Sequence, residues 1–372
     1  MIRVLSPVAS LLIGVAILLA GQGLQGILLP VRAGLEGFST LSIGLMGGAY
    51  FFGFTLGCLR GSSLVRRVGH IRVFAAMTAV ASTAPLLHGL WSDAWLWWLL
   101  RFIAGYCFAV LYVVIESWLN EQSSNETRGT VFSAYTLITL TVMAGGQQML
   151  HLYDPQQMAL FAIASALVSI AALPVVLSAT SSPGQPEVEV KLDLPRLFSI
   201  SPAGALGCLA AGLANGAFWA LAPVFVAGYS KDISLAAWFM TAAVLGGALG
   251  QWPLGWWSDR VDRRWVIVSA ATSGVFVGLM IWWSFEGTST LSLMIHSAAW
   301  GAVAFPIYAV SVAHANDYAR PDEYVMISSC LLLMYGVGAI LGPFVAPAVM
   351  KFAGPGGLYL FAALVHLALL VY

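Results

Sequence analysis

A few charged and polar side chains interrupt the long apolar runs of this sequence, and they are the residues best suited to chemistry. Arg101 lies about six residues into one such run, roughly 9 Å along a helix. An isolated arginine in hydrocarbon costs several kcal/mol, so its guanidinium should face a water-filled cavity or a partner. Because a guanidinium keeps its proton, Arg101 is expected to bind an anion or to tune a nearby acid. Outward snorkelling and hydrogen bonds to backbone carbonyls are the structural alternatives.

Glu116 is the one acidic residue that lies well inside an apolar run, toward the far end of the run that holds Arg101. Its carboxylate can pair with Arg60, Arg66 or Arg67, either as part of a gate or for structure alone. Glu116 can also carry a proton, because a carboxyl group can bind a proton and release it again. The third alternative is that Glu116 snorkels to the membrane interface.

Amide side chains occupy equivalent places in the two halves of the sequence. Gln22 and Gln25 lie in the first apolar run, and Asn215 lies in the seventh. They are candidates to line a central cavity, although amides also join helices through hydrogen bonds worth about 0.6 kcal/mol each. His296 can titrate near neutral pH or form an interhelical hydrogen bond. Further cavity candidates, each more often a packing residue, are Tyr50, Tyr112, Gln147, Gln148, Trp219, Trp300 and Tyr308.

The composition indicates that lipid is the solvent of this chain. Of its 372 residues, 60% are hydrophobic and 9% are charged, whereas soluble domains carry roughly 25% charged residues. The formal net charge is zero, so a basic surface for nucleic acid is not expected. Mean hydropathy is +0.87. Cys58, Cys107, Cys208 and Cys330 lie singly in apolar runs, which predicts neither disulfides nor a metal site.

Twelve apolar segments are long enough to cross a bilayer as helices. A polar stretch at 179–201, which is rich in Pro, Gly and Ser, divides them into two groups of six and is expected to be a linker loop. The predicted domains are therefore 1–178, 179–201 and 202–372. The first span is expected to be a retained helix, and the last reaches Tyr372 without a polar tail, as in a shortened chain. The spans are expected near 7–30, 40–63, 71–91, 95–118, 130–151, 157–178, 202–227, 234–257, 265–285, 289–312, 325–349 and 355–372.

Lysine and arginine are distributed unequally between the loops on the two sides of the predicted membrane. Three lie on one side, at Arg32, Lys231 and Lys351. The positive-inside rule therefore predicts that both termini and the linker are cytoplasmic. The other, positively charged side carries Arg3, Arg66, Arg67, Arg72, Arg128, Lys191, Arg196, Arg260, Arg263, Arg264 and Arg320.

The two halves of the sequence repeat with an offset of 193 residues. This offset maps Gln22-Gly23 onto Asn215-Gly216 and Pro30-Val31 onto Pro223-Val224. It also places the basic loop that starts at Arg66 over the loop that starts at Asp259. Because six spans return the chain to the same side, the halves should be parallel repeats related by an axis along the membrane normal.

A glycine, acid and arginine pattern closes the eighth span. It reads Gly250-x4-Gly255-x3-Asp259-Arg260-x2-Arg263-Arg264, and it resembles the inter-helix signature of the major facilitator superfamily. Small residues let helices approach closely, and the acid and the basic residues beyond it can form a charge cluster that holds a gate shut. A solvated positive loop is the alternative. The first-half copy keeps Arg66 and Arg67 but lacks the acid.

Two further motifs resemble the same superfamily. Arg101-x3-Gly105 resembles its fourth-helix motif, whose arginine is linked to proton coupling. Gly338-x3-Gly342-Pro343 resembles the glycine-proline motif of proton antiporters, but it lies in the eleventh span rather than the fifth. The segments Leu35–Ser39, Gly69–Arg72 and Glu116–Asn120 resemble the YcaD-like branch, whose substrates are poorly defined.

These features predict an all-α integral membrane protein of twelve helices in two six-helix bundles with pseudo-two-fold symmetry. The resemblance implies a secondary active transporter in the bacterial inner membrane, which moves a small organic solute by alternating access and exports it with protons. The alternative is a facilitator or importer of small organic anions that bind at Arg101. We expect a monomer in the lipid bilayer, with a small-molecule substrate, with protons as possible partners, and with no enzymatic activity, cofactor, metal or nucleic acid.

Overall fold

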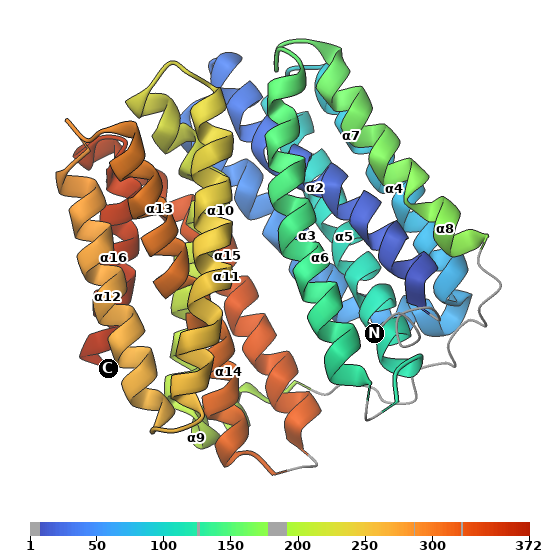
Figure 1. Ribbon diagram of the computed structural model, residues 1–372. Helices are drawn as coiled ribbons and strands as arrows, with labels where there is room; N and C mark the ends of the chain where they lie inside the picture. Colours follow the sequence, from blue (N-terminus) through green and yellow to red (C-terminus); the bar gives the residue numbers. More distant parts are fainter. Residues whose placement is uncertain (1–7, 125–126, 178–191, 286, 321–322) are drawn as a thin grey trace. The chain divides into compact units, whose positions relative to one another are not determined.

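The computed structural model describes residues 8–124, 127–177, 192–285, 287–320 and 323–372. These residues form helices joined by short loops, and no strand occurs among them, so the predicted all-α class is confirmed (Figure 1). Arg3, Glu126, Lys191 and the first part of the expected linker, 179–191, lie outside the described residues.

The chain divides into two compact units. Unit 1 comprises residues 1–37 and 52–187, and unit 2 comprises residues 38–51 and 188–372. Most of the boundary follows the sequence repeat, but the first part of the second span clusters with unit 2. In the first half of the chain the elements are α2 (Ala9–Leu35), α3 (Thr40–Val68), α4 (His70–Leu90), α5 (Ala94–Glu121), α6 (Arg128–Gln148), the short 3₁₀ helix η2 (Met149–Leu152), α7 (Met158–Ile170) and α8 (Ala172–Val176).

The second half of the chain contains the helices that follow the expected linker. They are α9 (Leu194–Ile200), α10 (Pro202–Tyr229), α11 (Ser234–Ser258), α12 (Arg263–Trp283), α13 (Thr290–Ala304), α14 (Pro306–Tyr318), α15 (Tyr324–Ala353) and α16 (Gly357–Val371).

The helices follow the predicted spans closely. Among the described residues, eleven helical segments are long and apolar enough to cross a membrane, and the twelfth expected span is the shorter helix α16. The tenth span is broken into α13 and α14 at Phe305. Pro306 explains the break, because it has no backbone N–H to donate to the carbonyl four residues earlier.

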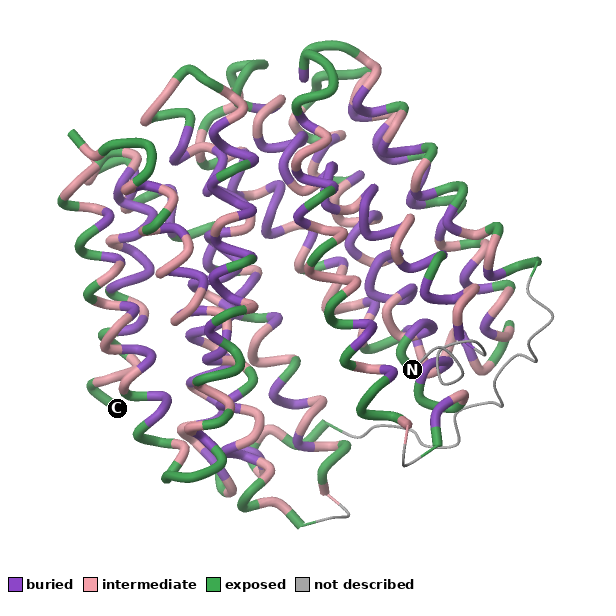
Figure 2. Tube along the Cα trace, in the orientation of Figure 1, coloured by how far each residue is buried: buried purple, intermediate pink, exposed green. Residues whose placement is uncertain are grey.

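The first helix of each half is the most enclosed part of its unit. The most apolar windows of α2 and α10 are 72% and 78% buried, more than in any other candidate span (Figure 2). Glycine permits this packing: a Cβ at Gly212 of α10 would overlap the carbonyl oxygen of Tyr335 on α15. A Cβ at Gly23 of α2 would likewise overlap the carbonyl of Met143 on α6.

Part of the expected linker loop is helical. Asp193 caps α9 by accepting a hydrogen bond from the Arg196 N–H at 2.9 Å, and Pro195 stands in the first turn. Both residue types favour a helix start, which is why the chain turns helical here. Leu197 of α9 is fully buried against α10, α14 and α15, in a cluster with Ala205, Cys208, Ala315, Ile327, Cys330 and Leu331.

An ion pair fastens α9 to the start of α15. Arg196 donates to both carboxylate oxygens of Glu323, from Nε at 2.8 Å and from Nη2 at 3.3 Å. The Arg320 backbone N–H also donates to Glu323, at 3.1 Å. The hydrogen bonds from Arg196, followed by the one from Arg320, lower the pKa of Glu323 from its ordinary value of 4.5.

The pH dependence of stability should report this ion pair. A carboxyl whose pKa is lower in the folded state stabilises the fold above its unfolded-state pKa, and it loses that effect as pH falls through the folded-state value. We expect Glu323→Gln to lower the thermal unfolding temperature at pH 7, and the difference from wild type to shrink progressively as pH falls below 4.5. Thermal unfolding of detergent-solubilised protein measures it.

The matched control for this prediction is Arg196→Gln. When Glu323→Gln is made in the Arg196→Gln background, it should lower the unfolding temperature much less than it does in wild type. A difference between wild type and Glu323→Gln that stays constant from pH 7 to pH 3.5 would show that the carboxylate contributes nothing through its charge.

Candidate functional site

One face of α5 carries three of the predicted site residues of unit 1. Arg101, Tyr112 and Glu116 fall within about 60° of one another around the helix axis, given about 100° per residue. The stripe extends for roughly 22 Å, most of the depth of a bilayer core. The α5 helix therefore presents a cation, a hydroxyl and a carboxyl along one line.

A hydrogen bond joins the middle of this stripe to α2. The Tyr112 hydroxyl donates to Gln22 Oε1 at 3.0 Å, across 90 residues of sequence. The Tyr112 ring also meets Phe54 of α3 edge-on, with 5.9 Å between ring centroids. Two residues that were predicted separately as cavity candidates, Gln22 and Tyr112, thus form one polar contact.

Glu116 at the other end of the stripe is hydrogen-bonded to Tyr135 of α6. Tyr135 in turn interacts with Thr139 one turn further along α6. Cys58 of α3 lies close enough to Glu116 to feel its charge. The structure thus supplies a tyrosine partner for Glu116, and the expected pairing with Arg60, Arg66 or Arg67 stays a prediction.

Arg101 lies half-buried near a second titratable residue. His88 of α4 is within range of its charge, and His88 Nδ1 lies 2.6 Å from the Ala84 carbonyl oxygen. The His88 ring packs on Trp97 of α5 with 5.0 Å between centroids. The structure thus places an ionisable ring within range of the Arg101 charge, and the role of the guanidinium stays a prediction.

Other predicted residues of the first half are buried. Gln25 is 2% exposed, and neither atom of its amide has a hydrogen-bond partner among the described residues. Gln147 of α6 is also 2% exposed. Tyr50 is buried next to Phe51, in the part of α3 that clusters with unit 2. Whether these side chains meet a solute stays a prediction.

In unit 2, an amide and several aromatic rings form two groups of contacts. Asn215 of α10 hydrogen-bonds to Tyr335 of α15. Tyr335 packs on Tyr308 of α14, with 4.9 Å between centroids. Trp219, one turn after Asn215, stacks on Phe305 at 5.6 Å and an interplanar angle of 18°. Three predicted residues, Asn215, Trp219 and Tyr308, are thereby brought together.

Two predicted residues on α13 lie apart from this set. Trp300 is fully buried and packs on Tyr359 and His366 of α16, each at 5.3 Å. His296 is half-buried, and its Nδ1 has no hydrogen-bond partner among the described residues. Trp300 therefore packs inside unit 2, whereas the role of His296 stays open to test.

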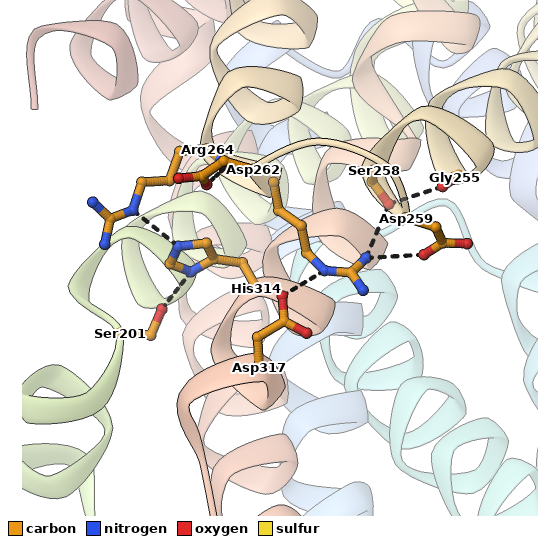
Figure 3. Close-up of polar contacts among 9 residues, drawn as sticks. Ser201, Gly255, Ser258, Asp259, Asp262, Arg264, His314 and Asp317 are labelled. Atoms are coloured by element: carbon orange, nitrogen blue, oxygen red, sulfur yellow. Dashed lines mark hydrogen bonds and ion pairs between the residues drawn. The ribbon is translucent and has the colours of Figure 1, made fainter.

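The predicted charge cluster at Asp259 is present and extends to α14. Arg263 donates from Nε to Asp317 at 2.7 Å, and from Nη1 to Ser258 at 2.9 Å and to Asp259 at 3.4 Å (Figure 3). Arg260 instead lies over the Trp256 ring, 3.9 Å from its centroid. The acid–arginine pattern of the loop thus connects α11, α12 and α14. At the matching end of α3, Arg66 and Arg67 occupy the last turn.

A second hydrogen-bonded chain runs beside this cluster. Arg264 Nε donates to His314 Nε2 at 3.3 Å, so His314 carries its proton on Nδ1 and can donate it to Ser201 Oγ at 2.8 Å (Figure 3). Ser201 Oγ also accepts the Gly204 N–H and so caps α10. This chain ties the start of α10 to α12 and α14.

Several of these partner residues could not be recognised from the sequence alone. Tyr135 and Tyr335 are single tyrosines on apolar helices, where packing is the ordinary role. Asp317 lies 54 residues from Arg263 and is visible only through the fold. Among the described residues, no group of three or more His, Cys, Asp or Glu side chains is placed to hold a metal ion.

Comparisons with known proteins agree with this architecture. A family model described as Major Facilitator Superfamily matches residues 204–372. An uncharacterized MFS-type transporter of Enterobacter sp. strain 638 is 27% identical over 346 residues, which covers 93% of this chain and 89% of that protein. The uncharacterized MFS-type transporter YcaD of Escherichia fergusonii is 26% identical over 353 residues and covers the same shares.

Solved transporters share the fold. A mutant of the nucleoside transporter NupG matches with a TM-score of 0.81 at 13% identity, over 97% of this chain and 98% of that chain. The Escherichia coli fucose:proton symporter FucP matches with a TM-score of 0.61 at 15% identity, over 99% of this chain and 98% of that chain. At these identities the likeness establishes the fold alone.

The charge cluster should behave as a coupled unit. Asp317→Asn and Arg263→Gln should each lower the unfolding temperature, and the double variant should lose less than the sum, because the second change removes an already broken pair. We expect a coupling free energy of about 1 kcal/mol or less, since the Asp317 side chain is 49% exposed. Additive effects would contradict this prediction, and Asp259→Asn, at the longer 3.4 Å contact, is the weaker control.

Proposed function

Because a family model described as Major Facilitator Superfamily matches residues 204–372 and the relatives are MFS-type transporters, we propose that this chain is a secondary active transporter of that superfamily, which exports a small organic solute with protons by alternating access. The membrane we propose is the bacterial inner membrane, with both termini in the cytoplasm, as the excess of arginine and lysine on one side predicts. The transporter is proposed to act as a monomer.

The observation that carries the proton coupling is the position of Glu116. Its carboxyl lies on a membrane span, it is hydrogen-bonded to Tyr135, and it forms no salt bridge to the described residues. A charge that moves between aqueous and low-dielectric surroundings is costly, and taking up a proton removes the charge. Proton binding at Glu116 can therefore favour one conformation over another.

Arg101 and Tyr112 support the same proposal. The Arg101 guanidinium stays charged, so it supplies a constant positive potential at one end of the stripe while Glu116 can change charge at the other. The Tyr112–Gln22 pair lies between them and offers neutral hydrogen-bonding groups to a solute. The fold is compatible with this coupling, because FucP is described as a proton symporter.

Alternating access is supported by the way α3 is shared between the units. Its first part, residues 38–51, clusters with unit 2, and the remainder belongs to unit 1. Within unit 2, Gly44 and Gly47 lie so close to Pro343 and Ala220 that a Cβ on either glycine would overlap them. Small residues let the backbones approach closely there, and in our proposal this part of α3 changes its neighbours as access alternates.

Proteoliposomes test the coupling. We expect addition of a transported solute to change the internal pH, reported by an entrapped dye, and a pH gradient to accelerate solute flux. Glu116→Gln should abolish both effects because its amide cannot take up the proton. Glu121→Gln is the matched control, since Glu121 is on the same helix about 140° from Glu116.

Proton coupling would be contradicted if solute flux did not change with the pH gradient and if Glu116→Gln transported the solute as fast as wild type. Loss of coupling in Glu121→Gln to the same extent would contradict the specific role of Glu116. The folded state of each variant is checked by its unfolding temperature before flux is compared.

A further inference from the structure

The amide and aromatic residues of unit 2 form two groups of contacts that the proposed function leaves without a role, one of Asn215, Tyr335 and Tyr308 and the other of Trp219 and Phe305. We define the Asn215 cluster as Asn215, Trp219, Phe305, Tyr308 and Tyr335. We propose that this cluster binds a planar ring of the transported solute. It forms hydrogen bonds to a neutral edge of that ring, on which a hydrogen-bond donor lies next to an acceptor. This inference rests on the proposed function, because it names the class of solute carried.

Three helices bring the cluster together. Asn215 and Trp219 are one turn apart on α10, so they share a face. Phe305 stands at the break between α13 and α14, and Tyr308 follows one turn later. Tyr335 comes from α15 and contacts both Tyr308 and Asn215. Sites at interrupted helices are a recurrent arrangement in transporters, because the break frees backbone and side chains for a ligand.

Asn215 leaves a hydrogen-bonding group unused. Its side chain is nine-tenths or more buried, at 4% exposure, and Oδ1 has no partner among the described residues. The bond to Tyr335 therefore comes from the Asn215 amide N–H, which donates to the tyrosine oxygen. A buried carbonyl oxygen without a donor is unusual in a folded protein, so it points to a donor that arrives with a ligand.

The bond from Asn215 also orients Tyr335. Because the tyrosine oxygen accepts the amide N–H, its own proton is left to donate elsewhere. The cluster thus presents an acceptor, Asn215 Oδ1, beside a donor, the Tyr335 hydroxyl. The complementary ligand edge has an N–H next to a carbonyl, as in a cyclic amide.

The aromatic members favour a flat ring. Trp219, Phe305, Tyr308 and Tyr335 are all half-buried, so parts of their rings stay available while Asn215 lies behind them. Trp219 and Phe305 are nearly parallel, at 18°, which is a stacking geometry that a third ring can extend. All five side chains are neutral, so the part of the solute bound here should be neutral as well.

The other unpartnered aromatic set of unit 2 does not offer such a site. Trp300, Tyr359 and His366 also have polar atoms without partners among the described residues. Their exposures are 0%, 1% and 0%, so their rings are enclosed on every side. The Asn215 cluster differs because its four aromatic side chains remain partly accessible and only Asn215 itself is buried.

Three probe compounds separate the features of this site. Quinolin-2(1H)-one has a flat ring with adjacent N–H and C=O groups, its N-methyl derivative lacks the donor, and δ-valerolactam keeps the amide without the aromatic ring. Binding to the purified full chain is measured by calorimetry and by ligand-dependent thermal stabilisation. In wild type, quinolin-2(1H)-one should bind at least about tenfold more tightly than either of the other two.

Variants assign these preferences to residues. Asn215→Leu, which is close in volume, should bring quinolin-2(1H)-one and its N-methyl derivative to within about twofold of each other. Tyr335→Phe should weaken quinolin-2(1H)-one while retaining the fold, because it removes a single oxygen. Trp219→Phe should keep the preference for the aromatic probe over δ-valerolactam, and Trp219→Leu should lose it.

Equal affinity of wild type for quinolin-2(1H)-one and its N-methyl derivative would overturn the inference. So would quinolin-2(1H)-one binding weaker than about 1 mM, or a preference that survives Asn215→Leu. Binding is measured on the purified chain without a membrane or a pH gradient, so no proton gradient contributes to the result. A negative result in the binding measurement therefore does not affect the proteoliposome test of proton coupling. A negative result in the proteoliposome test likewise does not decide whether the Asn215 cluster binds the probes.

Discussion

Every polar group on a membrane span has to be satisfied within the protein or by water, and this constraint organises the chain. It accounts for the pairs that some polar residues of the spans form, whereas Gln25, Trp300, Tyr359 and His366 keep buried polar atoms without partners among the described residues. In unit 1, Gln22 meets Tyr112 and Glu116 meets Tyr135. In unit 2, Asn215 meets Tyr335. In the proposed function, neutral hydrogen-bonding groups on the most buried helix of each unit contact the solute, and the charge changes occur on one stripe of α5.

The same constraint separates parts that stay fixed from parts that can move. Where Arg263 meets Asp317 and Arg196 meets Glu323, ion pairs tie helix ends together at the loops, where water lowers the cost of charge. Within the spans, glycine and proline bring backbones into contact without polar partners, as Gly44 does beside Pro343. Small residues at these positions let the helix backbones approach closely.

Much of the fold could be predicted from the sequence, because apolar runs of bilayer length leave little choice but helices. Arg101 and Glu116 stood out for the same reason, as charges in hydrocarbon. The sequence repeat identified Asn215 as the counterpart of Gln22 in the second half. The missed features depend on contacts between distant segments: Tyr135 and Tyr335 look like packing residues until the fold places them beside Glu116 and Asn215. The helix α9 was missed because Pro, Gly and Ser dominate the stretch before it, although Asp193 and Pro195 mark its start.

The central claim is that the face of α5 that carries Arg101, Tyr112 and Glu116 is in contact with water. Cysteine accessibility tests it, after Cys58, Cys107, Cys208 and Cys330 have been replaced by alanine. Tyr112→Cys lies on the stripe, and Ile103→Cys lies about 180° away around the same helix. A charged, membrane-impermeant thiol reagent should modify Tyr112→Cys and leave Ile103→Cys unmodified. Equal modification of the two positions, or faster modification of Ile103→Cys, would contradict the account.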